Sequence, residues 1–185
     1  MQPTQIIQRN SSFLLLIDIQ ERLAPAIDQG TALIACNAWI LQIANQLGVP
    51  VVVSEQYPQG LGTTVAALQK HLTEATFIQK THFGLLAEDA ICAQLNTLQR
   101  PQVIVTGTEA HVCVLQSALQ LLAAGFQVFV VEDAVGSRVN RNKVLALQRM
   151  RDAGCVVVSS EMVAFEWLHK SATDEFRHIS KTYLR

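Results

Sequence analysis

The stretch VTGTEAHVCVLQSALQLLAAGFQVFVVEDAVGSR, residues Val105–Arg138, decides the fold class of this 185-residue chain. It starts within an apolar run that predicts a strand over Gln102–Gly107, and helical spacing of apolar residues then predicts a helix over Val114–Ala124. Gly125 follows where a left-handed C-cap residue belongs. A second apolar run predicts a strand over Gln127–Asp133. Two strands joined by a helix indicate a βαβ unit, the building block of a parallel sheet.

The same alternation continues on both sides of this stretch. Further strands are predicted over Phe13–Asp18, Pro50–Glu55, Thr76–Lys80 and Cys155–Ser159. Further helices are predicted over Leu33–Leu47, Leu85–Leu98 and Val144–Ala153. Several strand runs are continuously apolar, which is typical of strands covered on both faces. We therefore expect a single α/β domain over 1–185, a three-layer α/β/α sandwich around a six-stranded, mostly parallel sheet. Residues 161–185 are expected to add one or two helices against the body or against another subunit.

Composition excludes several classes of protein. Apolar residues make up 50% of the chain, charged residues 16%, and the net charge is −1, which argues against a disordered chain. No basic patch is dense enough for phosphate contacts, so we expect no nucleic-acid partner. The apolar runs are too short for a membrane helix, so no membrane partner is expected. The N-terminal residues lack the features of a signal peptide, so a cytoplasmic location is expected.

The chain has four cysteines, Cys36, Cys92, Cys113 and Cys155. None belongs to a CxxC pair and no zinc-ligand spacing is present, so a structural zinc is not expected. In a reducing compartment the four thiols are expected to be free.

Chemically useful side chains collect at the predicted carboxyl ends of the strands, where open parallel sheets bind ligands. Asp18 ends the first strand, Lys80 ends the third, and Cys113 follows the fourth at the start of a helix. A helix N-terminus and a nearby ammonium favour thiolate, so we expect a lowered pKa for the Cys113 thiol. Thiol, carboxylate and ammonium are the parts of acyl transfer through a thioester. Position alone leaves ordinary roles in packing, capping and solvation open for each of them.

On these residues the sequence resembles the isochorismatase-like cysteine hydrolase superfamily, which includes nicotinamidase and N-carbamoylsarcosine amidohydrolase. The resemblance runs along nearly the whole chain and is closest to the small single-domain isochorismatase domain-containing hydrolases. It is carried by LLLIDIQERLAPAI around Asp18, VVVSEQYPQGLGTT around Tyr57, QKTHFG at Lys80 and the stretch through Cys113 quoted above.

The resemblance implies a site and a topology. It places Asp18 on the catalytic aspartate, Lys80 on the catalytic lysine and Cys113 on the nucleophile. It implies a Rossmann-type strand order 3-2-1-4-5-6, with this triad at the switch point. It also implies a cis peptide at Thr108–Glu109, which turns the amides of Glu109 and Cys113 toward an oxyanion. Members of the superfamily commonly form homo-oligomers, so one is expected here.

The chain departs from the nicotinamidases near the second strand. Nicotinamidases carry an Asp-x-His motif and further histidines for a metal ion, whereas this chain has Ser54-Glu55-Gln56-Tyr57-Pro58. We therefore expect no metal and no other cofactor, which speaks against nicotinamidase activity.

Other residues near the strand ends have weaker assignments. The candidate substrate-binding residues are Gln20, Leu23, Tyr57, Leu61 and Phe83. The PQGLG loop is interpreted as a turn, with a lid as the alternative. His111 is interpreted as a structural residue and the Glu109 side chain as a support for the turn.

The expected function is metal-independent hydrolysis of a C–N bond in a small-molecule substrate through a Cys113 thioester. Asp18 is expected to act as acid and base, and Lys80 to stabilise the thiolate. One alternative is an isochorismatase-type hydrolase of a small cyclic acid that does not use the thiol. Another is a binding or redox-sensing protein on the same fold. The intact set of Asp18, Lys80 and Cys113 speaks against the latter.

Overall fold

The computed structural model describes residues 6–184, so the first five residues and Arg185 of the expected 1–185 domain lie outside the described residues. The strands are β1 (Ser12–Ile17), β2 (Val51–Gln56), β3 (Thr76–Lys80), β4 (Gln102–Thr108), β5 (Gln127–Gly136) and β6 (Val156–Val158). The α-helices are α1 (Gly30–Gln46), α2 (Pro58–Leu61), α3 (Ala66–Gln69), α4 (Asp89–Asn96), α5 (Leu115–Ala123), α6 (Asn140–Ala153), α7 (Ser160–Leu168) and α8 (Asp174–Tyr183). A π-helical turn, Ala110–Val114, joins β4 to α5.

The six strands form one sheet in the order β3-β2-β1-β4-β5-β6, and every neighbouring pair is parallel. The expected fold class and strand order are therefore confirmed. The chain order reverses between β1 and β4, which pair over Ser12–Ile17 and Gln102–Gly107. The carboxyl ends of these two strands mark the switch point, where such folds place their ligand sites.

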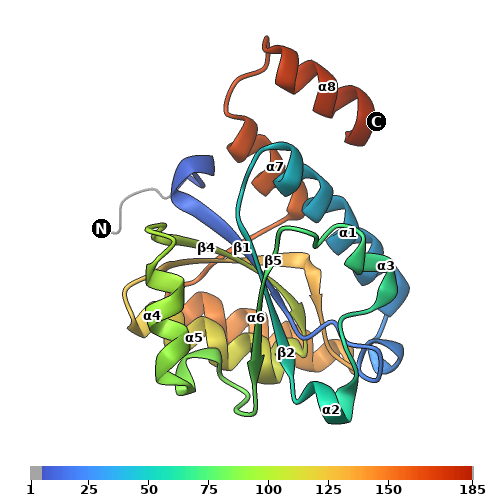
Figure 1. Ribbon diagram of the computed structural model, residues 1–185, viewed down its shortest axis with the longest axis vertical. Coiled ribbons are helices and arrows are strands. Elements are labelled where there is room, and N and C mark those ends of the chain that lie inside the picture. Colours follow the sequence, from blue (N-terminus) through green and yellow to red (C-terminus); the bar gives the residue numbers. More distant parts are fainter. Residues whose placement is uncertain (1–5, 185) are drawn as a thin grey trace.

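Helices cover both faces of the sheet and create two hydrophobic cores (Figure 1). Successive residues of β1 point to opposite faces: Leu14 and Leu16 join the core beneath α1 and α7, and Leu15 and Ile17 join the core beneath α4, α5 and α6. All six residues of β1 are buried. This two-sided burial explains why several of the strand runs are continuously apolar rather than alternating.

The segment expected to form one helix over Leu85–Leu98 is shorter and divided. Leu85–Ala87 forms a 3-10 turn and α4 begins only at Asp89. The amide of Leu85 donates to Ser117 Oγ at 3.0 Å, and the amide of Leu86 donates to Gln120 Oε1 at 2.8 Å. These α5 side chains bind the backbone donors of the segment and hold it against α5, which delays the helix.

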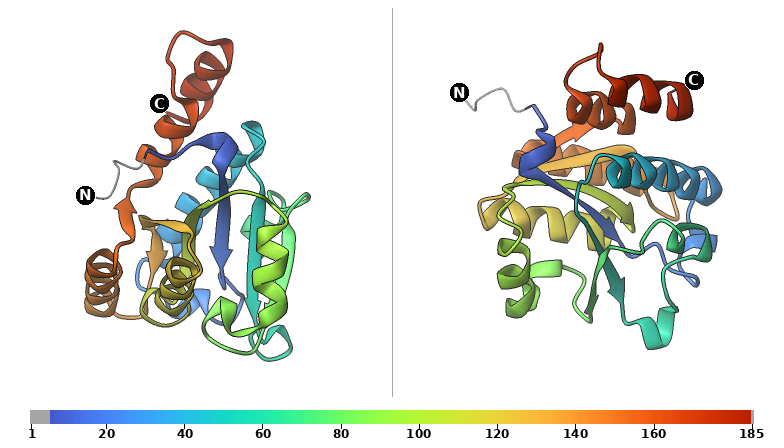
Figure 2. Two further views of the ribbon diagram at one scale, coloured as in Figure 1. Left: turned by 90° about the vertical axis from the view of Figure 1, so that its left-hand side faces the viewer. Right: turned by 45° about the horizontal axis from the view of Figure 1, so that its top comes forward.

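The C-terminal segment packs on its own domain as two helices, α7 and α8, with α8 outside α7 in Figure 2. Trp167 is buried and its indole donates to Ser12 Oγ at 2.8 Å. The indole of Trp39 in α1 donates to the Tyr183 carbonyl at 2.7 Å. In the described part of the chain, residues 6–184, no helix has the length and apolar character that crossing a membrane requires.

The strands at the switch point approach so closely that one position requires glycine. Gly107 has a φ of +120°, and a Cβ placed there would lie 2.0 Å from the Ile17 carbonyl oxygen and 2.6 Å from the Ile17 nitrogen. Backbone atoms in the middle of a sheet cannot move aside as a flexible side chain does. Gly107 thus allows β4 to approach the end of β1, directly before Asp18.

We expect Gly107→Ala to reduce the free energy of unfolding by about 3 kcal/mol or more, because backbone strain and a backbone collision act together. The control is Gly48→Ala, where φ is +65° but nothing lies within 4 Å of the added Cβ. That variant should lose only about 1–2 kcal/mol. Urea unfolding of the two variants measures both values. Equal losses would show that the close approach at Gly107 carries no cost.

Candidate active site

Asp18 follows β1 directly and is fully buried. Its backbone has a φ of +50°, and its amide donates to the Ser54 carbonyl at 3.1 Å. Oδ1 accepts a hydrogen bond from Ser54 Oγ at 2.7 Å, and Oδ2 accepts one from Lys80 Nζ at 2.7 Å. Burial raises the pKa of the Asp18 carboxyl, against the opposing charge and hydrogen bond of Lys80. A carboxylate with a raised pKa is a stronger proton acceptor than an exposed one.

Lys80 ends β3 and reaches across β2 to Asp18. Its side chain is fully buried, and Nζ donates to Asp18 Oδ2 at 2.7 Å, to Gln56 Oε1 at 2.6 Å and to the His82 carbonyl at 3.4 Å. An ammonium has three protons to donate, and three acceptors surround this one. The arrangement pairs the buried lysine with one carboxylate and two neutral oxygen acceptors.

Cys113 lies in the π-helical turn after β4 and is 5% exposed. Burial and the charge of Asp18 raise the pKa of its thiol to about 12, while the charge of Lys80 acts in the opposite direction. The expected lowering of this pKa is therefore wrong: loss of hydration outweighs the helix terminus and the ammonium. Both members of the ion pair act on this thiol, so the structure gathers the three residues into one site.

The turn before Cys113 connects β4 to the same site. The peptide bond between Thr108 and Glu109 is cis. Thr108 Oγ1 donates to the Asp18 carbonyl at 2.6 Å, and the Glu109 carbonyl accepts from the amides of Val112 and Val114 at 3.0 and 3.2 Å. These bonds tie the turn to the end of β1 on one side and to the π-helical turn on the other.

The side chains of Glu109 and His111 point to the loop after β5. The Glu109 carboxylate pairs with Arg138 Nε and lies 3.3 Å from His111 Nδ1. His111 Nδ1 also lies 2.9 Å from Ser137 Oγ. These partners fit the interpretation of both side chains as structural supports.

Four of the five candidate substrate-binding residues have exposed surface. Tyr57 and Phe83 are each 54% exposed, and Leu23 and Leu61 are half-buried. Gln20 requires a correction because it is fully buried. Its amide nitrogen donates to the carbonyls of Gln56 and Gly62 at 3.0 and 2.7 Å, and its oxygen accepts from the Gln56 amide at 2.8 Å. Gln20 links β2 to the following loop, and its side chain has no solvent-exposed surface in this structure.

Further hydrogen bonds hold the PQGLG loop. Arg22 Nη1 donates to the Gly60 carbonyl at 2.6 Å, and the Arg22 amide donates to the Leu61 carbonyl at 3.1 Å. The Tyr57 ring lies directly over Gly60, where an added Cβ would be 2.4 Å from it. These contacts describe a fixed turn that presents Tyr57, rather than a free lid.

Two residues with direct contacts to the ion pair were missed from the sequence. Ser54 binds Asp18, and Gln56 binds Lys80. Both lie at the end of β2, which the sheet order places between β1 and β3. That order was the available signal, because the middle strand of three must contribute the side chains between its neighbours.

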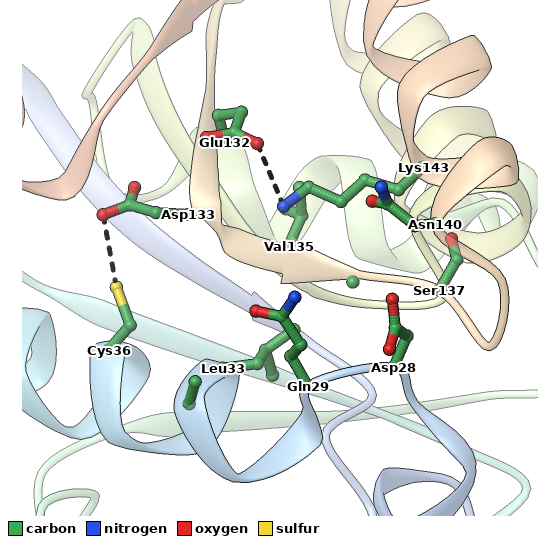
Figure 3. Close-up of a pocket in the computed structure, with 12 residues that line it drawn as sticks. Asp28, Gln29, Leu33, Cys36, Glu132, Asp133, Val135, Ser137, Asn140 and Lys143 are labelled. Atoms are coloured by element: carbon green, nitrogen blue, oxygen red, sulfur yellow. Dashed lines mark hydrogen bonds and ion pairs between the residues drawn. The ribbon is translucent and has the colours of Figure 1, made fainter.

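A separate cavity of about 500 Å³ lies between α1, the end of β5 and the start of α6 (Figure 3). It is lined mainly by polar groups, including Asp28, Gln29, Glu132 and Lys143, and by the Cys36 thiol. None of the predicted catalytic or substrate-binding residues lines it. Among residues 6–184, no three His, Cys, Asp or Glu side chains are grouped so that they can hold a metal ion.

Known proteins share this architecture. The chain is 39% identical over 163 residues to isochorismatase domain-containing protein 1 of Salmo salar, covering 88% of this chain and 57% of that protein. Among solved structures, the MAR1 ribonuclease from Caenorhabditis elegans has a TM-score of 0.90 and 33% identity, covering 98% of this chain and 93% of that one. The Escherichia coli YcaC gene product, described as an octameric hydrolase of unknown specificity, has a TM-score of 0.92 and 22% identity, covering 100% and 93%.

A family model extends the likeness over most of the described chain. The model for the isochorismatase domain matches residues 12–162, from the first residue of β1 into α7. That range contains all six strands, the buried ion pair and the turn that carries Cys113. The resemblance seen in the sequence is thus confirmed, and this chain belongs to the isochorismatase family.

Proposed function

We propose that the protein is a hydrolase that cleaves a C–N bond of a small molecule through a thioester on Cys113. The observation that carries the proposal is the buried Asp18–Lys80 ion pair acting on a buried thiol. A buried charge pair is costly, and here it is placed beside the nucleophile of the site. Membership of a hydrolase family supports the general class of reaction.

The first half of the reaction forms the thioester. The thiol proton moves to Asp18 while Sγ attacks the substrate carbonyl carbon. The amides of Glu109 and Cys113 bind the resulting oxyanion. The C–N bond then breaks, Asp18 returns its proton to the leaving amine, and the acyl group stays on sulfur.

The second half releases the acid. Asp18 takes a proton from a water molecule, whose oxygen attacks the thioester carbonyl. The C–S bond breaks, the carboxylic acid leaves, and Asp18 returns the proton to the sulfur. Lys80 stays protonated throughout and stabilises the negative charge as it moves between oxygen and sulfur.

A small molecule is a better substrate for this chain than RNA, although three structural neighbours are named as ribonucleases, two of them provisionally. The chain carries a net charge of −1 and has no run of basic residues to follow a phosphate backbone. The buried cation, Lys80, is already bound to three acceptors.

A homo-oligomer belongs to the proposal, supported by the octameric neighbour and by the exposed apolar residues Val144, Leu145 and Phe165. The cytoplasmic location remains a prediction.

We expect Cys113→Ala to abolish hydrolysis of a panel of small amides, because the thioester cannot form. Asp18→Asn should reduce turnover by about 10²–10⁴-fold, the usual contribution of an acid–base residue. The control is Cys36→Ala. Burial raises the pKa of this thiol to about 11, and Cys36 lies outside the triad, in the separate cavity. Amine release and the mass of the acylated protein are the measurements.

Full activity of Cys113→Ala would favour the alternative reaction, in which the thiol is not used. RNA cleavage without amide cleavage would exclude the proposed substrate class.

The raised pKa of the thiol predicts an unusual pH dependence for alkylation. With a thiol pKa of about 12, the thiolate fraction at Cys113 increases about tenfold per pH unit between pH 7 and 9, without a plateau. A free thiol with a pKa of about 8.5 levels off in this range. Rates of iodoacetamide labelling at Cys113, measured by peptide mass spectrometry with N-acetylcysteine as reference, test this. A plateau below pH 8.5 would instead show a thiolate preformed in the resting site.

A further inference from the structure

The turn that carries the nucleophile is held from outside by Arg138, which lies two residues after β5. Its Nε donates to Glu109 Oε1, and its backbone amide donates to Glu109 Oε2 at 3.4 Å. One residue therefore binds both oxygens of the carboxylate. Such two-point binding fixes the orientation of a carboxylate as well as its position.

The Glu109 carboxylate needs this partner because its side chain is only 10% exposed. A buried carboxylate without a cation carries a large desolvation cost. The neighbouring imidazole of His111 is engaged by Ser137 Oγ at 2.9 Å and by Asn142 Nδ2 at 3.5 Å. Arg138 contributes a guanidinium, whose planar fork of N–H donors suits a carboxylate partner.

The position of Glu109 makes this contact relevant to the proposed reaction, on which the following inference rests. The turn is fixed on its β4 side, where Thr108 Oγ1 donates to the Asp18 carbonyl at 2.6 Å. On its other side the Glu109 side chain is fixed by Arg138. The amide proposed to bind the oxyanion belongs to Glu109, between these two attachments.

We propose that Arg138 is a positioning residue for the oxyanion-binding amides and acts through the Glu109 carboxylate. Its side chain is 61% exposed, so it is accessible to substitution without opening a core. Without its cation, the Glu109 carboxylate turns toward water and takes its own amide out of alignment. Addition to a carbonyl, which creates an oxyanion, is then impaired. Direct displacement at carbon, which creates none, is unaffected.

Two reagents for Cys113 separate these effects. With p-nitrophenyl acetate, an S–C bond forms at the carbonyl through an oxyanion, the C–O bond breaks, p-nitrophenolate leaves, and the thiol proton is released. With iodoacetamide, sulfur attacks the CH₂ carbon directly: an S–C bond forms, the C–I bond breaks, and iodide and the thiol proton are released. We expect Arg138→Ala to slow acylation by about 10–100-fold, as a small misplacement does, and to change alkylation less than about twofold. Arg138→Gln keeps part of the aliphatic stem and a polar end but removes the charge, so it should show the same two effects as Arg138→Ala.

The controls decide between positioning and general damage. Arg9→Ala removes an arginine that is 36% exposed from its ion pair with Glu175. Arg9 precedes β1, at the opposite end of that strand from Asp18, so the substitution should change neither rate. Equal losses with both reagents in Arg138→Ala, or no loss with either, would overturn the inference. Wild-type protein that is alkylated but never acylated at Cys113 would overturn the proposed function itself, a result distinct from these.

A double substitution tests the route through Glu109. Glu109→Gln keeps the shape of the side chain and removes the charge that Arg138 holds. If Arg138 acts through that charge, adding Arg138→Ala to Glu109→Gln should lower the acylation rate by less than about twofold, because residues in one network are not additive. A further tenfold loss would show that Arg138 acts on the reaction by another route, contrary to the inference.

Discussion

The site depends on the ion pair between Lys80 and Asp18, buried away from water. Each buried ion costs several kcal/mol in lost hydration, and only close pairing with further hydrogen bonds offsets that cost. Here the further bonds come from Ser54 and Gln56 at the end of β2. The pair therefore requires β1, β2 and β3 to end at one level, and the parallel register provides this. The fold and the site are held by the same alignment of strand ends.

The same burial determines the chemistry available to the thiol. Loss of hydration raises the pKa values of both Cys113 and Asp18. The pKa of the proposed proton donor and that of its acceptor therefore shift in the same direction. In the proposed reaction the thiolate arises during attack rather than in the resting protein. This protects a nucleophile from adventitious oxidation, since reactivity follows thiolate character and exposure. The contact of Arg138 with Glu109 extends the same logic to the proposed oxyanion side, where a buried carboxylate is paired beside the turn that carries Cys113.

Much of the architecture was predictable from local patterns. Short apolar runs marked all six strands, and several of these runs were continuous because both faces of the central strands are covered. The glycine after Ala153 marked a helix end and adopts the left-handed conformation expected there. Strand order required the family resemblance, since alternation of strands and helices is compatible with several orders. The start of α4 was missed because Ser117 and Gln120 of another helix bind the backbone that a longer helix would use.

By itself, the sequence determined the α/β class, the approximate strands and the residues Asp18, Lys80 and Cys113 as candidates, because these depend on periodicity and on motifs along the chain. How those residues behave depends on their packing in the folded chain. The thiol pKa depends on how completely water is excluded, and that exclusion comes from segments distant in sequence. The same holds for Gln20, whose side-chain amide donates to the carbonyls of Gln56 and Gly62. These partners are distant in sequence and are brought to Gln20 by the fold. Charge and hydrogen bonding act through space, so their outcome is set by the packing of the folded chain.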